Sequence, residues 1–217
     1  MAKFTRISLL SVVLGLIPVL GSAATLVPVT DPTAPGGTDN VTRDLATGLE
    51  WLDLTTSLGL SYDDVQLQFG PGGGFEGWRH ATTAEVTTLF LSSAGLTLGT
   101  QPGVIDPLVT GFAGLFGVTQ AGGPANAQAA RGRYDDSATG SIGNSAGSAF
   151  VYWQQSGLFG NESQVSILDD QPAINSEPTT GTGHFLVRNT IPEPTTFILG
   201  AAACSWLLGA RRRAGRA

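Results

Sequence analysis

Continuous apolar runs occupy both ends of this 217-residue chain. The first run, residues 9–20, carries no charge, follows Lys3 and Arg6, and precedes four small residues at positions 21–24. A basic start, an apolar centre and a small-residue cleavage site are typical of a secretory signal peptide. An uncleaved anchor is the alternative, but a membrane span needs about 20 apolar residues. We therefore expect export through the translocon and removal of residues 1–24 by signal peptidase.

The second run, residues 197–210, is followed at once by a cluster of arginines. An apolar segment capped by basic residues is a stop-transfer pattern, because the arginines stay on the cytoplasmic side of the membrane. A buried C-terminal helix is the alternative, although a core helix seldom ends in three arginines. We expect a C-terminal transmembrane helix with a basic stop. Its membrane residues are Phe197, Leu199, Trp206, Leu207 and Leu208, and the stop is Arg211, Arg212 and Arg213.

Shorter apolar patterns between the two runs predict strands and helices. A strand is expected at residues 25–29, and Thr47-Gly48 predicts a turn before a second strand. Residues 61–69 fit either an alternating strand or a helix capped by Ser61. The helix is favoured slightly, because an acidic residue stands at its third position.

Two amphipathic helices are predicted in the middle of the chain. Thr82 is followed three residues later by Glu85, the spacing of a capping box, in which each side chain bonds a backbone amide at the helix start. Asp106 caps the second helix and Pro107 suits its first turn. The expected inward residues are Val86, Leu89 and Phe90 in the first helix, and Leu108, Val109, Phe112, Leu115 and Phe116 in the second.

The second half of the exported part contains a polar stretch and several strand-like stretches. Residues 119–148 are poor in large apolar side chains and rich in Gly, Ala, Ser and Asn, which predicts a long, mobile surface loop. Strands are expected at residues 149–154, 164–168 and 184–188. Early helices and separate strands without a βαβ repeat indicate an α+β fold, formed by a single exported domain at residues 25–190.

The exported domain is strongly acidic. Residues 25–190 hold 16 acidic residues and five arginines, a formal net charge of −11, and no lysine. This balance gives no electrostatic footprint for nucleic acid, so we expect no nucleic-acid partner. The single cysteine, Cys204, lies in the tail, so no disulfide is expected in the domain.

The end of the chain carries an ordered sorting signature. Ile191-Pro192-Glu193-Pro194 precedes the second apolar run and the arginines. The prolines keep the backbone extended and remove amide donors, so a membrane-bound processing enzyme could take this segment as a strand. Residues 191–217 resemble the PEP-CTERM sorting signal of Gram-negative bacteria. The resemblance implies anchoring in the inner membrane, processing by an exosortase, and placement at the cell surface or in the extracellular polysaccharide matrix of a biofilm.

Three short segments between residues 44 and 188 form a second pattern. They read Asp44-x-x-Thr47-Gly48-Leu49-x-Trp51, Gly77-Trp78-Arg79-x-Ala81-Thr82-x-x-Glu85 and Phe185-Leu186-Val187-Arg188. The pattern resembles the C-terminal domain family of the Legionella collagen-like adhesin. The resemblance implies a C-type-lectin-like α+β fold and glycan or matrix binding. By residue type alone these positions are structural: Trp51 and Trp78 anchor the core, and Arg79 pairs with a carboxylate or caps a carbonyl.

Two strings match enzyme motifs by letter only. Residues 72–77 fit G-x-G-x-x-G, but the predicted helix begins well past the last glycine, so we interpret them as a flexible turn. Residues 143–147 fit the nucleophile elbow G-x-S-x-G, and Asp169 or Asp170 and then His184 follow in hydrolase order. The elbow needs a strand before its serine and a helix after it, and neither is predicted.

The sequence therefore favours a non-enzymatic, exported surface or matrix protein that binds glycan or matrix or serves structurally, with no catalytic residue and no cofactor. The alternative is a secreted serine hydrolase that uses Ser145, His184 and Asp169 or Asp170. With two histidines and no cysteine in the domain, a zinc site is not expected. The acidic pairs at residues 135–136 and 169–170 lack the spacing of a calcium loop, and we interpret them as solvated surface carboxylates.

Overall fold

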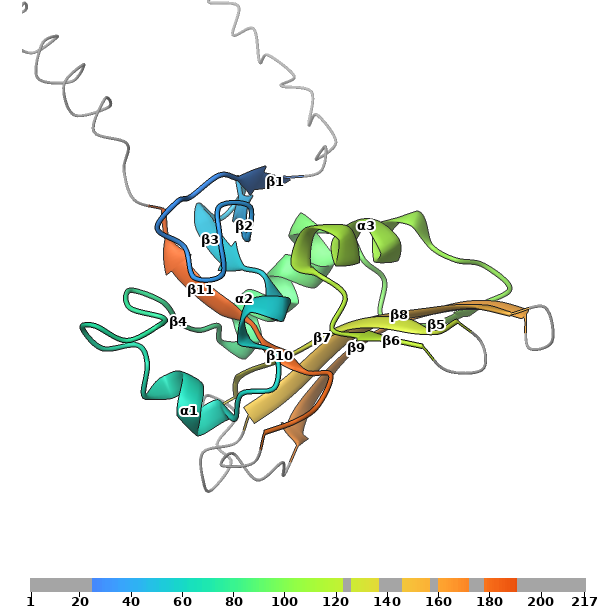
Figure 1. The fold of residues 1–217 in the computed structure, drawn as a ribbon. Coiled ribbons are helices and arrows are strands. Elements are labelled where there is room, and N and C mark those ends of the chain that lie inside the picture. The colour runs from blue at the N-terminus through green and yellow to red at the C-terminus, as the bar shows by residue number, and fades with distance from the viewer. Residues whose placement is uncertain (1–24, 123–125, 137–145, 157–159, 172–177, 191–217) are drawn as a thin grey trace, which may run out of the picture.

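The computed structural model describes residues 25–122, 126–136, 146–156, 160–171 and 178–190, with the backbone alone at residues 156 and 169–171 (Figure 1). The expected signal peptide, sorting motif, transmembrane segment and basic stop lie outside the described residues. Within the described residues, no helix is long and apolar enough to cross a membrane. Two β-sheets with a few short helices confirm the predicted α+β class.

The first sheet is antiparallel and holds both ends of the described chain. Its strands, in spatial order, are β1 (Leu26–Val29), β2 (Val41–Asp44), β3 (Leu49–Leu52), β11 (Leu186–Asn189) and β4 (Arg79–His80). The turn between β2 and β3 holds both ends, because the amide of Leu45 donates to Thr25 and the amide of Thr190 donates to Gly48. Gly48 has a φ of 73°, a conformation that favours glycine, and the predicted turn is confirmed.

The second sheet contains the longest strands of the molecule. In spatial order they are β10 (Gly183–His184), β7 (Gln128–Asp135), β8 (Ala146–Ser156), β9 (Gly160–Gln171) and β5 (Gly99–Pro102), with the short β6 (Gln120–Ala121) paired to β7. β10 runs parallel to β7, and the other pairs are antiparallel. The strands expected at residues 149–154, 164–168 and 184–188 are therefore confirmed, although β8 and β9 extend further and residues 184–188 divide between the two sheets.

The helices are short, and the α-helices among them begin after the expected capping residues. They are η1, a 3₁₀ turn (Leu54–Ser57), α1 (Tyr62–Gln66), α2 (Thr83–Thr88), η2, a π-helical turn (Leu89–Ser93), and α3 (Pro107–Phe116). Ser61 caps α1, which confirms the helix over the strand alternative. Both bonds of the capping box between Thr82 and Glu85 are present at α2, and Asp106 caps α3.

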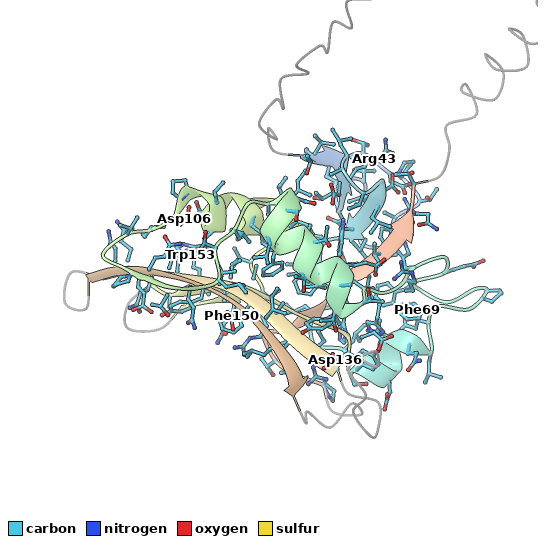
Figure 2. All side chains as sticks on the ribbon, turned by 180° about the vertical axis from the view of Figure 1, so that it is seen from behind. Arg43, Phe69, Asp106, Asp136, Phe150 and Trp153 are labelled. Atoms are coloured by element: carbon cyan, nitrogen blue, oxygen red, sulfur yellow. The ribbon has the colours of Figure 1, made fainter. Side chains whose placement is uncertain are left out.

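The main core lies between the two sheets. Figure 2 shows α3 lying across the inner face of the second sheet. Trp51 contacts Phe116 and Phe185 edge to face, with ring centroids 6.5 Å apart in both pairs. A smaller cluster on the other face of the first sheet packs Trp78 against Leu186 and its neighbours. Both tryptophans are buried, as predicted.

The prediction of a surface loop at residues 119–148 is wrong. β7 runs through this stretch, and β8 begins at Ala146. The strand is built from small residues because its inner face is crowded: a Cβ atom on Gly132 would lie 2.6 Å from the Leu54 side chain and 2.7 Å from Phe185. A composition of small residues therefore indicated close packing here, not exposure.

Two side chains differ in solvent exposure from what the sequence pattern predicted. Asp136 was expected in a solvated pair, but it is fully buried and its Oδ1 accepts a 2.9 Å hydrogen bond from the Thr83 hydroxyl. Leu108 was expected to face the core, but it is 49% exposed in the first turn of α3. A helix start presents its side chains to solvent when the neighbouring element does not reach that far, and spacing alone does not reveal this.

Candidate functional site

The outer face of the second sheet, turned away from α3, carries the candidate site. Successive side chains of a strand alternate between the two faces, so β8 directs Val151 and Trp153 to the core and Phe150 and Tyr152 outward. Figure 2 shows Trp153 on the side of α3 and Phe150 on the opposite side of the sheet. Aromatic residues therefore lie on both faces of one strand, and only those on the inner face belong to the core.

The strand register places the outward side chains in adjacent rows. Phe150 lies opposite Arg131 of β7, Tyr152 lies opposite Gln164 of β9, and Gln154 lies opposite Glu162. These six side chains are half-buried. We call them the outer patch: Arg131, Phe150, Tyr152, Gln154, Gln164 and Glu162.

Contacts within the outer patch fix its groups in place. The Arg131 guanidinium lies over the Phe150 ring, 4.9 Å from the centroid. The Tyr152 hydroxyl donates to Gln154 Oε1 at 2.7 Å, and Gln154 Nε2 donates to Glu162 Oε2 at 3.5 Å. Side chains that are already ordered lose less entropy on binding. Aromatic faces beside amide, carboxylate and guanidinium groups suit a sugar, which presents apolar C–H faces and hydroxyl groups.

Arg133 lies two residues beyond Arg131 and on the same face of β7. Only 6% of it is exposed. Its Nη2 donates to the Thr179 hydroxyl, whereas its Nη1 is buried without a hydrogen-bond partner. Burial lowers the pKa of Arg133, although a guanidinium stays charged at any physiological pH. Arg133 forms no ion pair with a described carboxylate, and a buried cation without such a partner is costly, which makes it an unusual feature of this face.

Two buried histidines connect the sheets next to Arg133. His80 lies on β4 and His184 on β10, and His80 Nε2 is 3.2 Å from His184 Nδ1. His184 Nε2 is 3.1 Å from the carbonyl oxygen of Leu60. Because a carbonyl only accepts, we assign the hydrogen of His184 to Nε2, and its Nδ1 then accepts from His80. Tyr62 stacks on His80 with ring centroids 3.9 Å apart.

This bonding pattern argues against the hydrolase alternative. Burial lowers the pKa of His184 to about 4, and both of its ring nitrogens are already bonded, so it has no lone pair to accept a proton from a serine. Ser145 and the side chains of Asp169 and Asp170 lie outside the described residues. β8 begins at Ala146, directly after that serine, where a nucleophile elbow requires a helix.

The residues of the adhesin-like pattern make structural contacts in the first sheet. The Arg188 guanidinium lies 4.4 Å from the centroid of Trp78 and forms a 2.8 Å ion pair with Glu50. Arg79 forms a 2.6 Å ion pair with Glu85, so the expected carboxylate partner is confirmed. Because both arginines already form ion pairs within the domain, we assign them a structural role.

A concave feature lies between β1, η2 and α3. It is an apolar hollow of about 150 Å³, lined by Leu26, Ser93, Ala94, Pro107, Leu108, Gly111, Phe112 and Leu115. The Ser93 hydroxyl beside it donates to the buried Asp44 at 2.5 Å. The hollow has few polar groups to orient a ligand. In the described part of the chain, no group of three or more His, Cys, Asp or Glu side chains is arranged to hold a metal.

Comparisons with protein-family models, with curated proteins and with solved structures found no match for this chain. The candidate site therefore rests on geometry. Sequence reasoning missed the outer patch, because residues 149–154 were predicted as a strand without assigning its side chains to the two faces. The signal was present in the sequence, because strand alternation puts Phe150, Tyr152 and Gln154 on the face opposite Ala149, Val151 and Trp153.

Proposed function

We propose that this chain is an exported, non-enzymatic surface or matrix protein whose domain binds polysaccharide through the outer patch. The observation that carries the proposal is the outward array of Arg131, Phe150 and Tyr152 beside two glutamine side chains. An open sheet face suits a long chain molecule, because small substrates are normally enclosed in a concave pocket. A C-type-lectin-like fold is part of the proposal, and the two sheets with few helices support it.

The position of the chain ends supports an anchored orientation. Both ends of the described chain leave the first sheet, and the second sheet extends to the other side of the molecule (Figure 1). A connection to a membrane segment after residue 190 would therefore not start from the sheet that carries the outer patch. We propose that residues 191–217 hold the protein in the inner membrane until an exosortase releases it to the surface or the matrix.

Tyr152→Ala is expected to weaken polysaccharide binding at least about tenfold, because buried aromatic contacts dominate most binding surfaces. Affinity gel electrophoresis of the exported protein in gels that contain soluble dextran or polygalacturonate measures this loss. Leu67→Ala is the matched control, since Leu67 is 83% exposed next to α1 and away from the outer patch. Unchanged retardation of Tyr152→Ala, at an unchanged urea midpoint, would contradict the proposal.

Removal of residues 191–217 is expected to move the protein from the membrane fraction to the soluble fraction without changing its urea midpoint. The core residues of both clusters precede residue 190, so folding does not require the tail. Cell fractionation and immunoblotting measure the distribution. Removal of residues 214–217 alone is the control, because it keeps the apolar run and three arginines. A truncated chain that stays with the membranes or is degraded would show that residues 197–210 form a buried helix of the fold and not a membrane anchor.

A further inference from the structure

The described arginines of the domain fall into two groups, those that form an ion pair and those that do not. Arg43, Arg79 and Arg188 each form an ion pair with an acidic side chain. Arg131 and Arg133 form no ion pair with any described residue. The two groups also differ in place, since the paired arginines belong to the first sheet and the unpaired ones to β7 of the second sheet.

The unpaired arginines lie next to each other on the outer face. They are two residues apart on one strand, which separates their Cα atoms by about 7 Å. The domain around them is acidic, with a formal net charge of −11 over residues 25–190. Two adjacent positive charges that form no ion pair with a described residue raise the local potential, which attracts an anionic ligand to that place.

The groups that surround Arg133 do not neutralise it. His184, its register partner on β10, is neutral because burial lowers its pKa to about 4. Asp135 is the next outward residue of β7, and it forms no ion pair with Arg133. Arg133 itself is buried with Nη1 unpartnered, and an anion nearby would offset the cost of that buried charge.

The geometry at Arg131 indicates the kind of anion. Its guanidinium lies over the Phe150 ring and forms no ion pair with a described residue, so a planar carboxylate can accept two of its N–H groups. Tyr152 is the next outward aromatic residue and offers a face to a neighbouring sugar ring. A sugar that carries a carboxylate satisfies both features at once.

We infer that the outer patch selects acidic polysaccharides built from uronic acids, with Arg131 binding the sugar carboxylate and Arg133 strengthening the local positive potential. This inference rests on the proposed polysaccharide binding and adds the ligand class. Arg131 is the contact residue because it is half-exposed, whereas Arg133 acts through its charge.

The test compares polygalacturonate with its fully methyl-esterified form, which has the same sugar chain without the negative charge. The exported protein is expected to bind the acid form at least about tenfold more tightly than the ester, and the difference should shrink as salt rises. Arg131→Gln is expected to remove this preference, so that the variant binds the acid form and the ester with equal affinity. Arg79→Gln is the matched control, since Arg79 lies on the first sheet and is paired with Glu85 of α2. This variant should keep the preference for the acid form.

Several outcomes would overturn the inference, and they are distinguishable. Equal binding of acid and ester by the unmodified protein removes the uronate preference and leaves the proposed function standing. Equal affinity for single-stranded DNA and polygalacturonate would show a general anion site. Binding to neither polymer overturns both proposals. Glu177 lies outside the described residues and is close in sequence to Thr179, so Glu177→Gln tests for an internal partner: a gain in acid binding would show that Glu177 occupies Arg133 in the free protein.

Discussion

Gly183→Ala is expected to lower the free energy of unfolding by about 3 kcal/mol or more, a large fraction of the stability of a typical domain. A Cβ atom at this position would lie 2.0 Å from the Leu54 carbonyl oxygen and 2.8 Å from its carbonyl carbon. Both atoms belong to the backbone of η1, so no side-chain rotation relieves the contact. β10 would have to move away from η1, and the register with β7 would be lost with it.

Urea unfolding followed by tryptophan fluorescence measures the effect of Gly183→Ala. Gly114→Ala is the matched control, because Gly114 is exposed in α3 and nothing lies within 4 Å of an added Cβ. That substitution is expected to stabilise the helix by about 0.5–1 kcal/mol. A Gly183→Ala midpoint within experimental error of the unmodified protein would show that β10 is not packed against η1 in solution.

Local rules predicted the elements whose signals are local. The caps of α1, α2 and α3 were found because Ser61, Thr82 and Asp106 bond amides within three residues of themselves. The turn at Gly48 was found for the same reason. Each signal occupies a few adjacent residues, so a single sequence contains all the information that is needed.

The parts that escaped prediction depend on contacts between distant residues. β7 was predicted as a loop because the reason for a glycine at residue 132 is close packing against Leu54 and Phe185, which are distant in the sequence. The histidine pair joins residues 104 positions apart, and nothing local marks either one. The outer patch likewise depends on the register of β7, β8 and β9. Sequence reasoning therefore reached the fold class and missed the candidate site.

The histidine pair is expected to make the domain acid-sensitive. His80 and His184 are neutral when folded, with pKa values of about 3 and about 4 caused first by burial. In the unfolded chain each has an ordinary pKa near 6.5. Between these values the unfolded state binds more protons, so stability is fully present above about pH 6.5 and falls as the pH falls. The slope is up to about 1.4 kcal/mol per pH unit for each histidine.

Asp53 opposes this effect over part of the same range. Burial raises the pKa of its carboxyl to about 6, and its Oδ1 is buried without a hydrogen-bond partner. The folded state therefore binds a proton at Asp53 that the unfolded chain binds only near pH 4, which adds stability as the pH falls from 6 to 4. The net slope of the unmodified protein in this range is expected to correspond to about one proton, and that of Asp53→Asn to about two.

Urea unfolding at half-unit intervals from pH 8 to pH 4.5 tests the histidine assignment. The slopes are compared between pH 6 and pH 5, because below pH 5 carboxylates with lowered folded pKa values, such as those of Asp31 and Glu85, begin to be protonated in the unfolded chain. Asp53→Asn should roughly double the slope below pH 6. His80→Gln should reduce the slope by about one proton, because its amide still donates to His184 Nδ1 but does not titrate. A stability that stays constant down to pH 4.5 in both the unmodified protein and Asp53→Asn would mean that the two histidines are hydrated and not bonded to each other.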